Sequence, residues 1–187
     1  LDKIESLCET EVLSVDRRRR SAQTYEKTTM TTHAAPLPEY IAGVRPPSAA
    51  WMGMDMVEYW PDEMRVRVCF TPTKDMCNFG GTVQGGFLAA MMDDAMGSLA
   101  FHALGAKVAP ASIDLSTHFM AAVPLKRIEV EAKIIRAGKA VVFAEARLYR
   151  EDGELSAQAT SSMKLRPFTG LQFDPNQNAE TPISKTK

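Results

Sequence analysis

Residues 78–104, NFGGTVQGGFLAAMMDDAMGSLAFHAL, decide the fold of this chain. The stretch opens on four glycines, Gly80, Gly81, Gly85 and Gly86, and continues as an apolar run without proline. A glycine-rich turn followed by such a run predicts a loop that opens a long, largely buried helix. The first backbone N–H groups of a helix have no partner within it, so this turn is also a place where a developing negative charge could be stabilised.

The predicted helix has three faces when its residues are spaced at 100°. The face expected to point into the core carries Leu88, Met92, Ala95, Met96 and Leu99. A mixed polar face carries Phe87, Met91, Asp94, Ser98 and His102. The third face surrounds one acid, Asp93, with small residues: Gly86, Ala89, Ala90, Gly97 and Ala100.

The two adjacent acids receive different interpretations. An ionised carboxylate is costly to bury unless it is paired or takes part in chemistry. We interpret Asp94 as a solvated residue of an amphipathic helix. Asp93 is the only reactive group on a face where small side chains let a helix, a backbone or a ligand approach, so it is the candidate functional acid.

Composition limits the class of protein. The chain has 187 residues, 45% of them apolar, which favours one globular domain with extensions. Its net charge of −1 gives no reason to expect nucleic acid as a partner, and no apolar run is long enough to predict a membrane span. Three cysteines without C-x-x-C spacing, and a first segment without an apolar signal core, favour a reducing, cytoplasmic location.

Three regions are expected along the chain. Residues 1–49 form an N-terminal extension: a short amphipathic helix ending in the arginines at positions 17–20, followed by an arm rich in Thr, Ala and Pro. The arginines either complement the helix dipole or form a patch for an anionic surface. Residues 50–170 form the main domain, and residues 171–187 form a polar tail.

The main domain shows alternation with a period of two on both sides of the helix. Strands are predicted at residues 52–60, 64–70, 112–120, 127–136, 140–150 and 155–165. In the first strand after the helix, Ile113, Leu115, Thr117 and Phe119 are predicted on one face and Ser112, Asp114, Ser116 and His118 on the other. Turns at residues 61–63, 137–139 and 151–154 join neighbouring strands. This order predicts an α+β fold, with a curved antiparallel sheet wrapped around one long helix.

The motifs resemble those of the hotdog-fold acyl-CoA thioesterases. The matching features are Asn78, the glycine turn, Gly85-Gly86, an acid seven residues further at Asp93, and SIDLSTHFM at residues 112–120. The most similar branch contains the phenylacetate-pathway thioesterase and thioesterase superfamily member 2. The resemblance spans about residues 50 to 168. It implies a hotdog fold and hydrolysis of an acyl- or aroyl-CoA thioester.

The resemblance also implies roles for individual residues. The backbone N–H of Gly85 would hold the oxyanion, and Asp93, facing across a dimer interface, would act as general base or nucleophile. Asn78 would orient the water or the carbonyl, and Ser112 would bind the water or the base of the partner subunit. No metal or cofactor is implied, since coenzyme A enters as part of the substrate. His33, His102 and His118 also lack the spacing of a metal site.

One position departs from the family pattern. Gln84 stands where the family has His. A glutamine amide donates a hydrogen bond but cannot exchange a proton near neutral pH. Activity should therefore survive if the family's His acts by polarisation and fall if it acts by proton transfer. The alternative interpretation is that Gln84 is a polar turn residue that caps the helix start.

Binding of coenzyme A should involve cations, because the molecule carries phosphates. Arg136, Lys139 and Arg166 lie near predicted strand ends and are candidates for this role, together with Gly86 at the helix start. Solvated charges at strand ends are the simpler explanation for the three cations.

Other functions and an assembly are also considered. A non-catalytic acyl-CoA binder or sensor would explain Gln84 and the basic extension. A hotdog dehydratase or hydratase is ranked lower, because neither Gln84 nor the helix start supplies the His that those enzymes use. One helix wrapped by one sheet leaves an open sheet edge. We therefore expect a homodimer with a continuous sheet, paired into a homotetramer.

Overall fold

A computed structural model describes residues 46–170 of the chain. The helix expected within residues 1–24, most of the Thr/Pro-rich arm and the polar tail at residues 171–187 lie outside the described residues. The segments that carry the predicted site lie inside them.

The described elements follow the predicted order closely. They are α1 (Pro47–Trp51), β1 (Asp55–Trp60), the 3-10 turn η2 (Pro61–Glu63), β2 (Arg65–Phe70), the 3-10 turn η3 (Lys74–Met76), α2 (Gly85–Ala103), β3 (Val108–Phe119), β4 (Ile128–Ala137), β5 (Val141–Arg150) and β6 (Leu155–Pro167).

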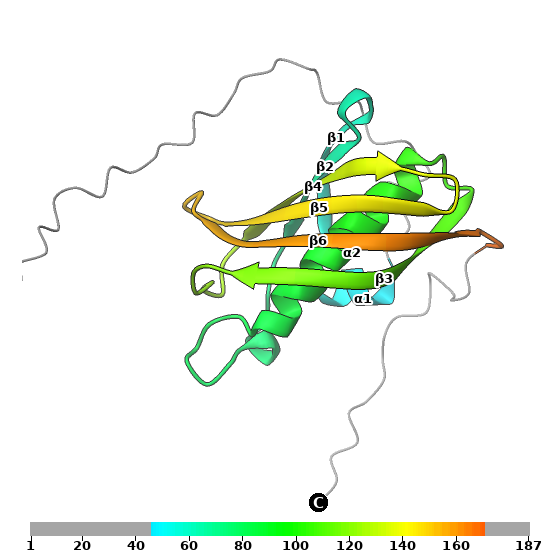
Figure 1. Ribbon diagram of the computed structural model, residues 1–187. Coiled ribbons are helices and arrows are strands. Elements are labelled where there is room, and N and C mark those ends of the chain that lie inside the picture. Colours follow the sequence, from blue (N-terminus) through cyan, green and yellow to red (C-terminus); the bar gives the residue numbers. More distant parts are fainter. Residues whose placement is uncertain (1–45, 171–187) are drawn as a thin grey trace, which may run out of the picture. The chain divides into compact units, whose positions relative to one another are not determined.

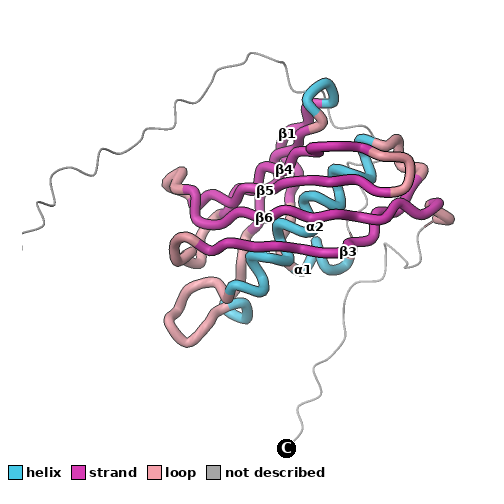
Figure 2. Tube along the Cα trace, viewed as in Figure 1, coloured by secondary structure: helices cyan, strands magenta, loops and turns pink. Residues whose placement is uncertain are grey.

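Within residues 46–170, six strands form one sheet in the order β1-β2-β4-β5-β6-β3. Every neighbouring pair of strands is antiparallel. The sheet curves around α2, which lies across one of its faces (Figure 1). The predicted α+β architecture is therefore confirmed. In Figure 2 the loop between η3 and α2 extends away from the sheet at the start of the helix.

The apolar stripe of α2 explains why the helix occupies the centre. Its five predicted core residues are all buried: Leu88, Met92, Ala95, Met96 and Leu99. Met91 and Ala100 are buried as well, so the buried stripe is wider than the helical pattern predicted. The helix ends at Ala103, and Gly105, two residues further on, has a φ of +74°, which suits a glycine just beyond a helix C-terminus.

The sheet buries the apolar side chains that alternate along its strands. Those fully buried on three consecutive strands are Ile128, Val130, Ala132, Ile134, Val142, Ala144, Ala146, Leu148, Ala157, Ala159 and Met163. The two predicted hairpins are also present. The Gly138 N–H donates to the Val141 carbonyl at 2.9 Å, and Gly153 adopts a φ of +82° in the β5–β6 turn.

Two elements differ from the sequence prediction. Helix α1 was not predicted; it starts with Pro47 at its first position, and Ala49 is buried in the core. Strand β3 begins at Val108, four residues before the predicted start at residue 112, and includes Pro110. Proline is tolerated because β3 is an edge strand, where one side of the backbone needs no ladder hydrogen bond. No helix in the described residues is long and apolar enough to cross a membrane.

The burial of α2 predicts where the fold is sensitive. Replacing Leu99, which is fully buried, with Ala removes apolar contacts and leaves a cavity. We expect a loss of about 2–5 kcal/mol in the free energy of unfolding, measured by chemical denaturation. Ile135→Ala is the control, because this side chain is 57% exposed, and should change stability by less than about 0.5 kcal/mol. Equal losses in the two variants would contradict the central role of α2.

Candidate active site

The start of α2 is fixed by the side chain of Gln84. Gln84 is the N-cap residue, and its Oε1 accepts a hydrogen bond from the backbone N–H of Gly86 at 2.6 Å. Its own N–H donates to the Met76 carbonyl at 2.8 Å, which ties the helix start to η3. The structure thus supports the interpretation of Gln84 as a helix cap. The N–H of Gly86, for which a substrate-binding role was predicted, therefore donates within the chain.

Gly85 is the first residue of α2 and lies against an aromatic ring. A Cβ atom built on Gly85 would lie 3.3 Å from Cζ of Phe119, at the end of β3. Phe119 itself is half exposed. Because the first N–H groups of a helix have no partner within it, the Gly85 N–H is a candidate donor next to this aromatic wall.

Asp93 and Ser112 meet beside the helix. Asp93 is half buried in the third turn of α2, and the Ser112 hydroxyl of β3 donates to Asp93 Oδ1 at 2.7 Å. This contact lies within one chain, whereas the resemblance implies that Ser112 binds the water or the base of a partner subunit. The physical reason is topological, since β3 follows α2 directly and runs back alongside it.

A β-bulge directs Ser112 toward the helix. Ser112 lies opposite Met163, but Asp114 lies opposite Ser162, so the register shifts between Ser112 and Asp114. Met163 is buried, and Ser112 therefore points to the same, helix-facing side of the sheet. Regular alternation had placed Ser112 and Asp114 on one face, and the extra residue at Ile113 separates them. That part of the strand prediction was wrong.

Asn78 shapes the loop that precedes the helix. Its Oδ1 accepts hydrogen bonds from the N–H groups of Gly80 at 2.8 Å and Thr82 at 3.3 Å. Its Nδ2 donates to the Thr82 hydroxyl at 2.9 Å. These contacts form a side-chain-to-backbone turn, which is a common use of asparagine. They give Asn78 a structural role that the sequence prediction did not include.

The three candidate cations gather at one end of the sheet. Arg136, Lys139 and Arg166 are exposed at the end of β4, in the β4–β5 turn and near the end of β6. The C-terminal part of α2 reaches the same end, where the rings of Phe101 and Phe168 lie 5.0 Å apart. The structure places the three cations at one end of the sheet, at the opposite end of α2 from Gly85 of the same chain.

Asp94 is not the solvated residue that was predicted. It is half buried, and its Oδ2 has no hydrogen-bond partner in the described part of the chain. Burial, with a smaller contribution from the Asp93 carboxylate, raises the pKa of Asp94 to about 6. The cause is the broad apolar stripe of α2, which reaches the flank that the helical pattern assigned to solvent. Burial likewise lowers the pKa of His102, two turns further on, to about 4.

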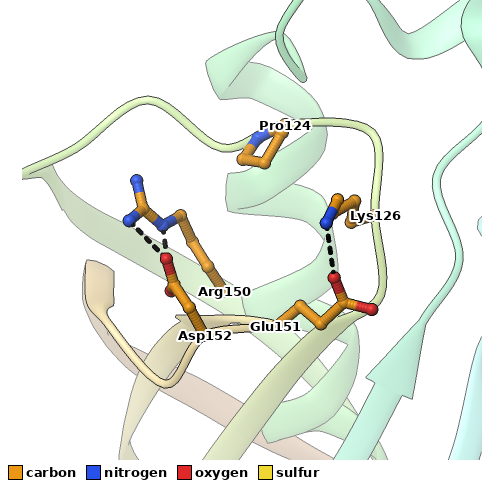
Figure 3. A pocket seen from close by; sticks show the side chains of 5 residues that line it. All are labelled: Pro124, Lys126, Arg150, Glu151 and Asp152. Carbon is orange, nitrogen blue, oxygen red and sulfur yellow. Dashed lines mark hydrogen bonds and ion pairs between the residues drawn. The ribbon is translucent and has the colours of Figure 1, made fainter.

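A small pocket with mostly charged lining residues lies between the loop after β3 and the β5–β6 turn (Figure 3). It is lined by Pro124, Lys126, Arg150, Glu151 and Asp152. Each cation is paired with a carboxylate. Lys126 Nζ lies 2.9 Å from Glu151, and Arg150 Nη2 lies 2.7 Å from Asp152. The balanced charges make this pocket a poor candidate for binding phosphates.

Comparison with known proteins finds one matching family model. Residues 80–157 match the family model of the thioesterase superfamily. The match confirms the resemblance to thioesterases seen in the sequence, and with it the predicted class, a thioester hydrolase. The matched segment contains α2 with Gly85 and Asp93, and Ser112 of β3. No curated protein is detectably similar to the chain in sequence.

Solved structures support the same fold. A phenylacetic acid degradation-related protein from Ralstonia eutropha JMP134 has 24% identity and a TM-score of 0.60, over 70% of this chain and 92% of that protein. A thioesterase family protein from Silicibacter pomeroyi has 22% identity and a TM-score of 0.61, over 66% of this chain and 92% of that one. A thioesterase from Haemophilus influenzae has 11% identity and a TM-score of 0.60, over 67% of this chain and 87% of that one. These similarities confirm the hotdog fold.

The buried acid predicts a pH-dependent stability. The folded chain holds the Asp94 proton more tightly than the unfolded chain, so Asp94 lowers wild-type stability as the pH rises from 3.8 to about 6. Asp94→Asn removes this dependence. The free energy of unfolding of the variant, relative to that of wild type, should therefore rise by on the order of 2 kcal/mol from acidic to neutral pH. Chemical denaturation of both proteins at the two pH values measures this difference. Asp75→Asn, at an exposed acid of η3, is the control. A difference between Asp94→Asn and wild type that does not vary with pH would refute this assignment.

Proposed function

We propose that the protein hydrolyses an acyl- or aroyl-CoA thioester to the free acid and coenzyme A. The observation that carries the proposal is the hydrogen-bonded pair of Asp93 and Ser112, on the small-residue side of α2 in a segment that matches the thioesterase superfamily. A carboxylate beside a hydroxyl can hold a water molecule and accept its proton. The proposed reaction needs no metal or cofactor beyond the coenzyme A of the substrate.

The spacing along α2 argues that the reaction needs two copies of the chain. Gly85 and Asp93 are eight residues apart on one helix, which corresponds to roughly 12 Å along its axis. An oxyanion must lie about 3 Å from its donor, and a base must reach the attacking water directly. One thioester carbonyl therefore cannot use both groups of the same chain. Pairing Asp93 of one copy with the Gly85 N–H of another removes this difficulty.

The edge strand β3 offers a way to bring two copies together. In the described residues, β3 pairs with β6 on one side only. Its exposed apolar side chains are Ile113, Leu115 and Phe119, followed directly by Met120. Long apolar edges tend to pair with another strand. If two copies of β3 paired antiparallel, the Phe119 end of one strand would lie next to Ser112 of the other. Gly85 lies beside Phe119 in its own chain, so it would also come close to that Ser112.

The proposed steps follow from this arrangement. Asp93, oriented by Ser112, takes a proton from water as the water oxygen attacks the carbonyl carbon. The partner subunit's Gly85 N–H stabilises the negative charge on the carbonyl oxygen, which for one such donor contributes about 3–4 kcal/mol. The C–S bond then breaks, and the thiolate of coenzyme A takes up a proton. Attack by Asp93 itself, giving an anhydride that water hydrolyses, is the alternative course.

Gln84 supports this chemistry without exchanging a proton. Its side chain holds the Gly86 N–H, so it fixes the orientation of the helix start where Gly85 donates. The cations Arg136, Lys139 and Arg166 lie at the end of the sheet that would adjoin the partner's helix start, and we propose that they attract the phosphates of coenzyme A. Both cysteines in the described residues, Cys69 and Cys77, are free thiols, which agrees with the proposed cytoplasmic location.

A second candidate is an acyl-CoA binder or sensor without catalysis. The observation in its favour is that Gln84, in place of an ionisable residue, is used as a helix cap. This candidate predicts binding of acyl-CoA without release of free thiol.

The proposed base can be tested directly. Asp93→Asn keeps the shape of the side chain but loses its basicity, so thiol release from a panel of acyl- and aroyl-CoA substrates should fall by roughly 100-fold or more. Asp94→Asn is the matched control, since it removes the adjacent carboxylate and should retain measurable turnover. Wild-type binding of acyl-CoA without thiol release would instead favour the sensor. Turnover that is unchanged in Asp93→Asn would exclude this residue as the base.

A mixing experiment tests whether two copies share one site. Gly85→Pro removes the N–H at the first helical position, where proline is well tolerated, and Gly85→Ala is the control that keeps the donor. Gly85→Pro and Asp93→Asn should each be inactive alone. Unfolded together in equal amounts and refolded, they should recover roughly a quarter of wild-type activity, because half the dimers are mixed and each holds one intact site. If light scattering shows that the refolded mixture forms dimers but no activity returns, Gly85 and Asp93 act within the same chain.

A further inference from the structure

The orientation of Ser112 depends on the bulge in β3. If β3 alternated regularly, Ser112 would share the outer face of the sheet with Asp114, away from α2. The extra residue at Ile113 returns Ser112 to the inner face, where it reaches Asp93. Bulges often re-aim a side chain next to an active site, at the cost of backbone hydrogen bonds in the ladder. Something must therefore hold this bulge in place.

The neighbouring strand holds the bulge through Asp114. The carboxylate of Asp114 accepts hydrogen bonds from the Ser162 hydroxyl and from the Ser162 N–H, the latter at 3.3 Å. The backbone carbonyl of Asp114 accepts a further hydrogen bond from the Ser161 hydroxyl at 2.8 Å. Ser161 and Ser162 are both buried in β6. Three contacts thus join the residue that follows the bulge to two adjacent serines.

This arrangement differs from that of an ordinary edge-strand acid. Charged residues often lie on edge strands, where they prevent unwanted pairing with other chains. Such a residue needs only exposure to solvent. Asp114 instead bonds to β6 through both its carboxylate and its carbonyl, at the point where the register changes.

We propose that Asp114, anchored by Ser161 and Ser162, is a positioning residue that sets the bulge and thereby aims Ser112 at Asp93. The inference rests on the proposed thioester hydrolysis. Asp114 does not touch the reacting atoms in this account. Its effect passes through Ser112, so removing Asp114 should matter only while Ser112 is present.

A double-mutant cycle tests this dependence. Asp114→Ala and Ser162→Ala should each lower kcat roughly 10- to 100-fold with little change in KM, because the base is misoriented while the substrate still binds. In the Ser112→Ala background the same changes should have almost no further effect on kcat. Asp114→Asn, which keeps one acceptor for Ser162, should lose less. Ser116→Ala, on the same outer face of β3, is the control and should behave as wild type.

The outcomes separate the inference from the proposed function. A full additional loss in the Ser112→Ala background, or wild-type kcat in Asp114→Ala, would overturn the positioning role while leaving hydrolysis intact. If wild type releases no thiol, the proposed function fails, and crystal structures of wild type and Asp114→Ala decide the positioning role. Loss of the Ser112–Asp93 hydrogen bond in that variant supports it, and retention of the bond rejects it. Should Asp114→Ala not fold, Ser162→Ala and Asp114→Asn carry the same test.

Discussion

Burial of the apolar stripe of α2 against the concave side of one sheet is the constraint on which the rest of the structure depends. The stripe is continuous and wide, from Leu88 to Ala100. A single sheet can cover it only by curving, and a sheet that curves without closing keeps two edges. One edge is β1 and the other is β3, which follows the helix directly. The position of β3 beside the uncovered flank of α2 is therefore a consequence of covering the core, and the candidate site lies along this flank.

The same constraint separates the two reactive ends of the helix. The helix start presents Gly85 and is fixed by the Gln84 cap, whereas Asp93 lies two turns further on and meets Ser112. A straight helix cannot bring these groups together, and the residues that lie between them on the Asp93 face, Gly86, Ala89 and Ala90, are small. A second copy of the chain can approach such a face closely. Its presence would explain both the small side chains and the separation of the two reactive groups. The apolar residues of β3 are consistent with this explanation. On an unpaired edge strand they would be exposed to solvent and would not stabilise the fold.

The sequence predicted the elements and most of the core because hydrophobic periodicity reports directly which face is buried. The inner positions of β4, β5 and β6 and five core residues of α2 could all be assigned in this way. The orientation of Ser112 could not, since the position of a bulge depends on contacts with β6 that are distant in sequence. Asp94 was misassigned for a related reason: a helical wheel ranks faces by polarity, but the sheet also covers the flank next to the apolar stripe. Gln84 could be recognised as a cap, although not as the residue that occupies the Gly86 N–H.

Adjacent acids on one helix can have opposite environments, and here this difference decides which of them can act on a substrate. Asp94 lies among buried apolar side chains, where a carboxylate is favoured in its protonated form. Asp93 is turned about 100° away from it around the helix axis, toward the flank that the sheet leaves open and toward a hydroxyl that can orient it. A raised pKa is often taken as the mark of a catalytic acid, but the raised pKa on this helix belongs to Asp94 and results from its burial. Geometry, and not proton affinity alone, therefore selects Asp93 as the candidate base.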